Sequence, residues 1–156
     1  MDLTTLVKPS SVACVSGITS KKRALEQLAK LLSGDADDDA SLRIYQQLTE
    51  REKLGSTSLG HGVALPHARV GACEKARGAF IKLDEAIDFD SPDGQATDLL
   101  FALMVPEKDT DEHLRIIAAL AAMFNDASMV ERLRSMGNDT ELFNTLTGWQ
   151  IDSEAS

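Results

Sequence analysis

One segment of the chain is apolar at every position. It reads Leu99-Leu100-Phe101-Ala102-Leu103-Met104-Val105 and is followed at once by Pro106. A strand that is buried on both faces has this pattern, because neither of its faces meets water. We therefore expect this strand in the centre of a sheet that carries helices on both sides.

Shorter apolar segments and helical repeats lie on either side of this run. Strands are expected at residues 12–15, 63–65 and 80–83, and Ser91-Pro92-Asp93-Gly94 has the composition of a turn. Helices and strands are mixed in their order along the chain, which is typical of α/β folds. We predict a single-domain three-layer α/β/α sandwich with a mixed central sheet.

Two helices are expected in the first third of the chain. Ser20 suits the N-cap of the first, and Gly34 stands where that helix should end. Its apolar repeat is Leu25, Leu28 and Leu32. The second should cover residues 40–53, after an acidic turn over residues 35–39. Its inner face is predicted to consist of Leu42, Tyr45 and Leu48.

The C-terminal third is expected to be helical, because its apolar residues repeat at helical spacing. One stripe consists of Leu114, Ile117, Ala118, Ala121 and Phe124. Another consists of Met129, Val130, Leu133 and Met136. Asn138 and Glu141 have capping-box spacing ahead of a third apolar group. Residues 148–156 are predicted to form a polar tail.

The bulk composition fits one folded domain that binds neither nucleic acid nor a membrane. Of the 156 residues, 43% are apolar and 26% are charged, which are ordinary globular values. The net charge of −9 disfavours nucleic acid, whose binding is driven by basic side chains. The basic cluster Lys21-Lys22-Arg23 is interpreted as a solvated helix start. Without a long apolar run or a signal peptide, the protein is expected in the cytoplasm.

The candidate site lies between Arg51 and His67. Glycines in this segment allow tight bends and the approach of an anion to backbone N–H groups, and Ser56-Thr57-Ser58 adds hydroxyl donors. The planar guanidinium of Arg51 suits the oxygens of a phosphate. Pro66 restricts the backbone that presents His67 at the end of the expected strand 63–65.

These residue types suit a histidine that carries a phosphoryl group. Neutral imidazole is a nucleophile near pH 7, since its ordinary pKa is about 6.5. The transfer also needs donors for the phosphoryl oxygens and a partner that fixes the tautomer of the ring. His113 is the candidate second histidine. It lies near the start of a helix just after the central strand, where ligands of open α/β sheets often lie.

A metal site is the alternative chemistry for the same residues. His61, His67, Cys73 and His113 are all possible zinc ligands. The six-residue gaps among the first three match no standard zinc spacing, so we predict no metal and no cofactor. Two cysteines in an acidic chain make no disulfide framework, so Cys14 and Cys73 are expected to be free.

Three segments resemble those of a known family. The first, Arg51-Glu-Lys-Leu-Gly-Ser-Thr-Ser-Leu-Gly-His-Gly-Val-Ala-Leu-Pro-His67, resembles the active-site motif of fructose/mannitol-type enzyme IIA domains of the bacterial phosphoenolpyruvate-dependent phosphotransferase system. Residues 20–26 are similar to the first-helix signature of its nitrogen-type branch. Residues 98–106 with His113-Leu114 are similar to its central strand and second histidine. The resemblance covers residues 4–147, which we take as the domain.

The resemblance implies a phosphoryl-carrier function on a mixed sheet between helical layers. His67 would take the phosphoryl group on Nε2 from a small phosphohistidine carrier protein, with Arg51 and His113 in support. Nitrogen-type members act mainly as regulators, through contacts with downstream proteins that depend on phosphorylation. The chain shows no fused IIB, membrane or carrier domain, which favours this branch. We expect a regulator of nitrogen, potassium or carbon metabolism that works as a monomer or weak dimer.

Two positions depart from the family pattern. His61 stands where the family commonly has Asn or an acid. We count it with Ser56-Thr57-Ser58 among the supporting residues, where it would tune His67, accept a proton or have no role. Ala68 and Arg69 replace a typical Gly and Lys. A left-handed backbone at Ala68 would cost about 1 kcal/mol because of its Cβ.

Two other functions are compatible with the sequence. One is a sugar-specific IIA component that passes phosphate to a IIB domain. The other is a binding module that keeps the fold but is no longer phosphorylated. Uptake of phosphate distinguishes the second from a relay, because only a relay becomes labelled.

Overall fold

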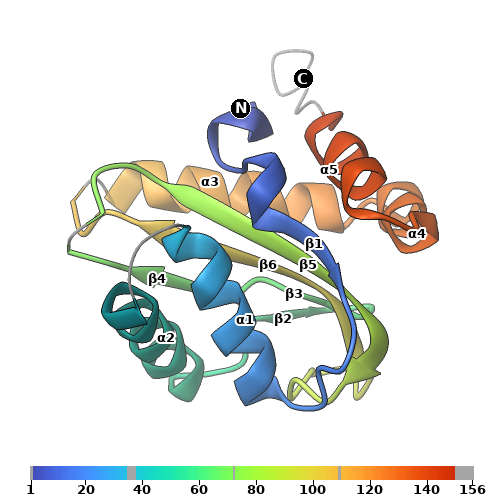
Figure 1. Ribbon diagram of the computed structural model, residues 1–156, viewed down its shortest axis with the longest axis horizontal. Coiled ribbons are helices and arrows are strands. Elements are labelled where there is room, and N and C mark those ends of the chain that lie inside the picture. Colours follow the sequence, from blue (N-terminus) through green and yellow to red (C-terminus); the bar gives the residue numbers. More distant parts are fainter. Residues whose placement is uncertain (1, 35–37, 72, 109, 150–156) are drawn as a thin grey trace.

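The apolar run forms the central strand that its pattern predicts. The computed structural model describes residues 2–34, 38–71, 73–108 and 110–149 (Figure 1). In these residues β6 (Thr97–Val105) pairs with β5 (Arg77–Ile87) on one side and with β3 (Val63–Ala64) and β4 (His67–Arg69) on the other. β1 (Val12–Val15) and β2 (Ser58–Gly60) complete the strand order β1-β5-β6-β3-β2.

The sheet is mixed, as expected. β5 runs antiparallel to β6, whereas β3 and β4 run parallel to it. β3 and β4 follow one another along the same side of β6, with a break between them. Val63 lies opposite Leu99 and His67 lies opposite Leu103. Between them the Pro66 carbonyl accepts a hydrogen bond from the Leu103 N–H at 2.9 Å. His67 is therefore held at the first residue of β4, rather than at the end of the preceding strand.

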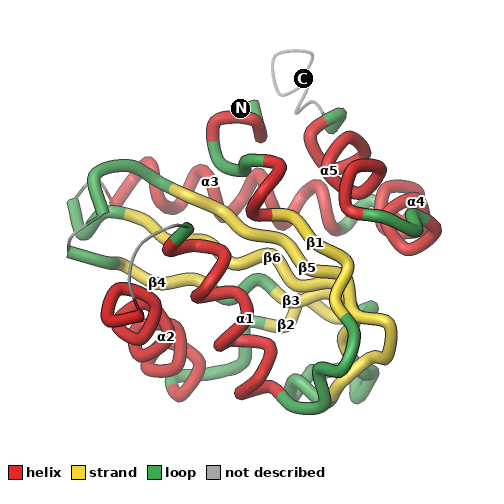
Figure 2. The backbone as a smooth tube through the Cα atoms, viewed as in Figure 1, coloured by secondary structure: helices red, strands yellow, loops and turns green. Residues whose placement is uncertain are grey.

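Helices cover both faces of the sheet, which confirms the three-layer prediction (Figure 2). α1 (Lys21–Ser33) and α2 (Asp38–Lys53) lie on one face. The other face carries α3 (Thr110–Phe124), α4 (Ala127–Ser135), α5 (Asp139–Thr147) and the short 3-10 turns η1 (Leu3–Thr5) and η2 (Pro9–Ser11). None of the described helices is long and apolar enough to span a membrane.

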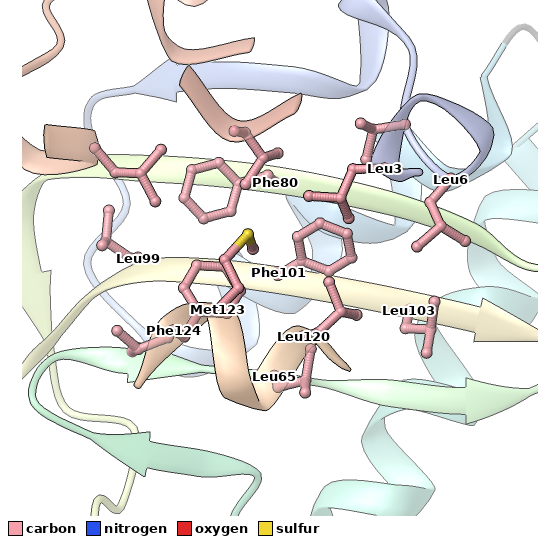
Figure 3. Close-up of a cluster of buried hydrophobic side chains, with 14 of the residues drawn as sticks. Leu3, Leu6, Leu65, Phe80, Leu99, Phe101, Leu103, Leu120, Met123 and Phe124 are labelled. Carbon is pink, nitrogen blue, oxygen red and sulfur yellow. The ribbon is translucent and has the colours of Figure 1, made fainter. Parts of the chain in front are cut away.

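β6 supplies both halves of the core, because successive side chains of a strand point to opposite faces. Leu99, Phe101, Leu103 and Val105 belong to the core on the side of α3, α4 and α5. Figure 3 shows the first three of them beside Leu120, Met123 and Phe124 of α3. Leu100, Ala102 and Met104 pack towards α1 and α2. On the first face three aromatic rings meet, and the ring centroids of Phe80 and Phe124 are 5.8 Å apart. Each face thus has its own apolar core.

The predicted ends of two helices are confirmed. The Ser20 hydroxyl accepts the Arg23 N–H at 3.2 Å, and α1 ends at Gly34, whose φ is 62°. Asn138 accepts the Glu141 N–H at 2.9 Å and begins α5. The expected strand at residues 80–83 is the middle of the longer β5. Residues 35–37 of the expected acidic turn and 150–156 of the tail lie outside the described residues.

Two predicted helix faces are wrong in part: Leu48 and Phe124 are buried as expected, but one leucine of each face is exposed. Leu42 is 53% exposed, and the buried residues of α2 are Ile44, Leu48 and Glu52. In α3, Leu114 is 60% exposed, and Ile116 and its helical neighbours lie in the core instead. Apolar residues lie on more than one side of each helix, so their spacing alone allows either of two faces to be the buried one. Packing against the sheet decides which face is buried.

Asp38 and Asp39 were expected in a turn but belong to the first turn of α2. Carboxylates are favourable there, because the N-terminal end of a helix carries partial positive charge. The helix therefore begins two residues before the predicted residue 40.

Candidate functional site

His67 is half-buried on the sheet face that carries α3. Its Nδ1 lies 2.9 Å from the Leu65 carbonyl oxygen. A carbonyl oxygen can only accept, so Nδ1 carries the proton of the neutral ring. The lone pair is then on Nε2. Leu65 and Pro66 lie between β3 and β4, where the strand is interrupted. This interruption leaves the Leu65 carbonyl available to bond with the ring.

The surroundings of His67 favour the neutral ring. Burial is the largest effect and lowers the pKa of His67 below its ordinary value of 6.5. The hydrogen bond to Leu65 acts in the opposite direction, the positive charge of Arg51 lowers the pKa further, and the negative charge of Glu52 raises it. Near pH 7 the ring is thus mainly neutral, which is the form that can act as a nucleophile.

His113 lies beside His67, as predicted from its place after the central strand. It is in the first turn of α3 and is 7% exposed. The two ring centroids are 5.7 Å apart, and the ring planes are at 75°. Burial, His67 and Arg69 together lower the pKa of His113. The expected proximity of His113 to His67 is therefore found, whereas its support of a phosphoryl group remains a prediction.

Arg69 fixes the tautomer of His113. Its Nε–H donates to His113 Nδ1 at 3.4 Å, so the proton of the neutral ring is on Nε2. That Nε2–H is buried and has no hydrogen-bond partner among the described residues. A buried donor without a partner costs about 1–3 kcal/mol, which an acceptor oxygen placed there would recover. Apart from its position two residues after His67, nothing in the sequence pattern indicated this role for Arg69.

Arg51 reaches the site through the loop that follows α2. Its Nη1 donates to the Gly55 carbonyl at 3.0 Å. The Leu65 N–H donates to the Thr57 carbonyl at 3.0 Å, so this loop is bonded to the segment that leads into His67. The positive charge of Arg51 also lowers the pKa of His67, which indicates that the guanidinium lies near that ring.

Glu52 is a site residue that the sequence analysis missed. It is 8% exposed and accepts hydrogen bonds from both the N–H and the hydroxyl of Thr57. Lys21 Nζ lies 2.9 Å from its carboxylate. Glu52 thus holds the loop that runs beside His67. The available signal was its spacing of four residues from Leu48, which places both on the buried face of α2.

Lys21 was interpreted as part of a solvated helix start, and this is wrong. Besides Glu52 it contacts Asp90 at 3.1 Å, and it lies 4.6 Å from the centre of the Phe89 ring. The cation connects the start of α1, the end of α2 and the loop after β5. This arrangement compensates the buried charge of Glu52, which would be costly alone.

The hydroxyl groups of residues 56–58 are all bonded within the protein. Ser56 donates to the Phe89 carbonyl at 2.9 Å, Ser58 donates to the Val63 carbonyl at 3.3 Å, and Thr57 donates to Glu52. These bonds shape the loop. The expected contacts of Ser56, Thr57 and Ser58 with a phosphate remain predictions, and they would require these hydroxyl protons to turn away from their present acceptors.

His61 does not join the site. It is exposed in the turn between β2 and β3, where its N–H donates to Asp93 at 2.8 Å. Val63 lies opposite Leu99 and His67 lies opposite Leu103, so the two positions are separated by four residues of β6, or about 13 Å at 3.3 Å per residue. His61 precedes Val63 and lies beyond it. Of the three roles left open for His61, this position favours no direct role at His67, because a turn and β3 lie between the two residues.

The backbone explains the residue type at position 61. Its φ is 55°, in the left-handed region that Asn, Asp and His adopt more readily than other side chains. Ala68, in contrast, lies in β4 and has no positive φ, so the strain expected there does not arise.

The possible metal ligands are dispersed. Only His67 and His113 lie together, while the Cys73 thiol bonds to the Lys75 carbonyl at 2.8 Å. Among the described residues no three His, Cys, Asp or Glu side chains gather in a way that could hold a metal ion. Cys14 and Cys73 are both free, as expected.

Comparison with known proteins decides the family. The model of the family described as phosphoenolpyruvate-dependent sugar phosphotransferase system, EIIA 2, matches residues 5–148. The chain belongs to this EIIA 2 family. The match includes every site residue named above and agrees with the resemblance found in the sequence.

The similarity of this EIIA chain extends to the nitrogen-type branch. It is 42% identical over 131 residues to the nitrogen regulatory protein of Pseudomonas aeruginosa, covering 84% of this chain and 85% of that protein. The crystal structure of nitrogen regulatory protein IIA-Ntr from Neisseria meningitidis has a TM-score of 0.83 at 36% identity, covering 92% of this chain and 98% of that one. The nitrogen-type resemblance is therefore confirmed.

A more distant structure shares the fold alone. It is the Escherichia coli IIA mannitol enzyme in complex with phosphorylated enzyme IIB, with a TM-score of 0.72 at 23% identity, covering 92% of this chain and all of that one.

The close contact between Gly62 and Arg134 allows a test of how tightly this EIIA domain is packed there. Gly62 has a φ of 80°, and a Cβ there would meet the Arg134 guanidinium, which is bonded to Asp98 at 2.9 Å. Gly17 has the same φ with open space around it. Both Gly→Ala variants should lose about 1 kcal/mol to backbone strain. Gly62→Ala should lose about 1–3 kcal/mol more to overpacking, measured by urea unfolding. Equal losses would show that Arg134 moves away freely.

The two charges next to His67 should shift its pKa in opposite directions. Glu52→Gln removes a charge that raises this pKa, so the pKa should fall further below 6.5. Arg51→Gln removes a charge that lowers it, so the pKa should rise. NMR titration of the imidazole measures both. Thr57→Val is the control, because it removes the hydroxyl bond to Glu52 without changing charge. A shift in that variant as large as in Glu52→Gln would assign the effect to loop structure.

Proposed function

We propose that this chain is a phosphoryl carrier that accepts a phosphoryl group on Nε2 of His67 from a phosphohistidine carrier protein. The observation that carries the proposal is the bond between His67 Nδ1 and the Leu65 carbonyl. It places the lone pair on Nε2 and holds the ring in one orientation. The lowered pKa keeps that lone pair available near neutral pH.

The transfer needs no group beyond the two proteins. His67 Nε2 forms a bond to phosphorus while the N–P bond of the donor phosphohistidine breaks, and the donor ring leaves with that electron pair. The phosphoryl oxygens carry negative charge throughout, so catalysis depends on cations and donors placed around them.

His113 and Arg51 are the proposed holders of those oxygens. The buried Nε2–H of His113 has no hydrogen-bond partner among the described residues. The His113 ring that carries it lies next to the ring of His67. Arg51 is positioned by Gly55 on the adjoining loop, and its side chain is partly exposed. In this proposal a phosphoryl oxygen becomes the missing acceptor for His113, and Arg51 balances the added charge.

We further propose a regulatory role, with phosphorylation as the switch. The relatives named nitrogen regulatory protein support this branch. A phosphoryl group brings about two negative charges to a half-buried ring at the surface, which changes which protein can dock there. Downstream proteins would then distinguish the two forms by charge.

The alternative function is a sugar-specific IIA component. The mannitol IIA structure that shares the fold was determined with phosphorylated IIB. To separate the two, the phosphorylated chain is mixed with the mannitol IIB domain of E. coli. Rapid transfer of the label to IIB would favour the sugar-specific function, whereas retention of the label on this chain favours the regulator.

The direct test of the relay is phosphate uptake. Incubation with enzyme I, its carrier protein and labelled phosphoenolpyruvate should add one phosphoryl group per chain. The label should be lost in acid and kept in base, as expected for an N–P bond. A chain that stays unlabelled, while a known EIIA protein in the same mixture is labelled, would instead be a binding module with this fold.

A further inference from the structure

A cavity opens on the sheet face opposite His67. Its volume is about 540 Å³, and it is lined by residues of α1 and α2 together with residues 70, 71 and 73–75, which follow β4. Its floor consists of Leu32, Ile44 and Met104, which are all buried core side chains. These residues belong to the core on the α1 and α2 side, whereas His67 and His113 lie on the α3 side. The cavity is therefore separate from the phosphoryl site.

The rim of the cavity is positively charged. It carries Arg43, Lys75 and Arg77, and one acidic side chain, Glu74. None of the three cationic groups makes an ion pair or a side-chain hydrogen bond with any part of the described chain. The whole protein has 25 acidic and 16 basic residues and is therefore negatively charged. Three unpaired cations around one opening have the opposite sign to that net charge.

We propose that this cavity binds a small organic anion with an apolar body. The apolar part would pack on Leu32, Ile44 and Met104, and the carboxylate or phosphate would pair with Arg43 and Arg77 at the rim. Small-molecule sites typically measure about 300–1,000 Å³ and combine an apolar lining with a few polar groups, and this cavity has both features. The guanidinium groups suit such an anion, because they form paired hydrogen bonds to its oxygens.

Binding is tested on the full chain by NMR, with octanoate as the probe. Saturable shifts are expected at the backbone amides of Ile44, Val70 and Gly71. Two comparison molecules separate the two parts of the proposal. Neutral 1-octanol lacks the charge and inorganic phosphate lacks the apolar body, so each should bind at least about tenfold more weakly. Equal binding of either one, or shifts that do not saturate with octanoate, would overturn the proposal.

Variants of the rim locate the site. Arg43→Gln and Arg77→Gln should each weaken octanoate binding about threefold to tenfold, because each removes one charge partner. Arg132→Gln on α4 is the matched control, since it is also exposed and lies on the other face of the sheet. Unchanged affinity in the double variant Arg43→Gln/Arg77→Gln would exclude this rim. No phosphotransferase component is present, so either outcome is independent of the proposed relay.

Discussion

A His67→Gln variant is expected to take up no phosphate at all. Glutamine has a similar reach and can donate to the Leu65 carbonyl, but its amide nitrogen has no free lone pair to attack phosphorus. The loss should therefore be complete rather than partial, and the fold should be kept, because His67 is only half-buried. Labelled phosphoenolpyruvate with enzyme I and the carrier protein measures the uptake.

The other two histidines provide the matched controls, since the chain has three in all. His61→Gln should be labelled at the normal rate, because its position lies at the far end of β3 from His67. His113→Gln should be labelled slowly, because it loses a donor but leaves the nucleophile in place. Full labelling of His67→Gln would move the phosphoryl group to another residue and end the assignment.

Replacing Arg51 by glutamine should slow phosphate uptake by about a hundredfold. Loss of one donor or charge that stabilises developing negative charge typically costs 10²–10³ in rate, and Arg51, in the last turn of α2, is a cation whose charge acts on His67. Arg51→Lys should recover part of the rate, because it keeps the charge but not the planar geometry. Rapid-quench measurements of labelling give the rates.

Stability separates this effect from a structural one. Arg51 is partly exposed, and its side chain makes one hydrogen bond within the described residues, to the Gly55 carbonyl, so the free energy of unfolding should change by no more than about 1 kcal/mol. Arg23→Gln is the control, since its side chain is 69% exposed and lies in α1. A normal rate in Arg51→Gln would remove this residue from the mechanism, whatever its effect on pKa.

The features that sequence alone determined are those set by local rules or by continuous pattern. An uninterrupted apolar run at residues 99–105 has to be a strand with two buried faces, and β6 is that strand. Ser20 and Gly34 mark the ends of α1, because capping depends on neighbours in the chain. The resemblance around residues 51–67 indicated the family, which the comparison confirms.

Other features depend on which surfaces pack together when the chain folds, and the sequence pattern did not indicate them. Leu42 and Leu114 had the right spacing for burial and are exposed, because the sheet selects one of two possible helix orientations. Glu52 looks like a surface acid until Lys21 and Thr57 enclose it. His61 is close to His67 in number but not in space, whereas His113 is 46 positions away and touches it. Residues that are near in sequence move apart along an extended strand by about 3.3 Å per residue. The parallel pairing of β4 with β6, and α3 after β6, bring His67 and His113 together.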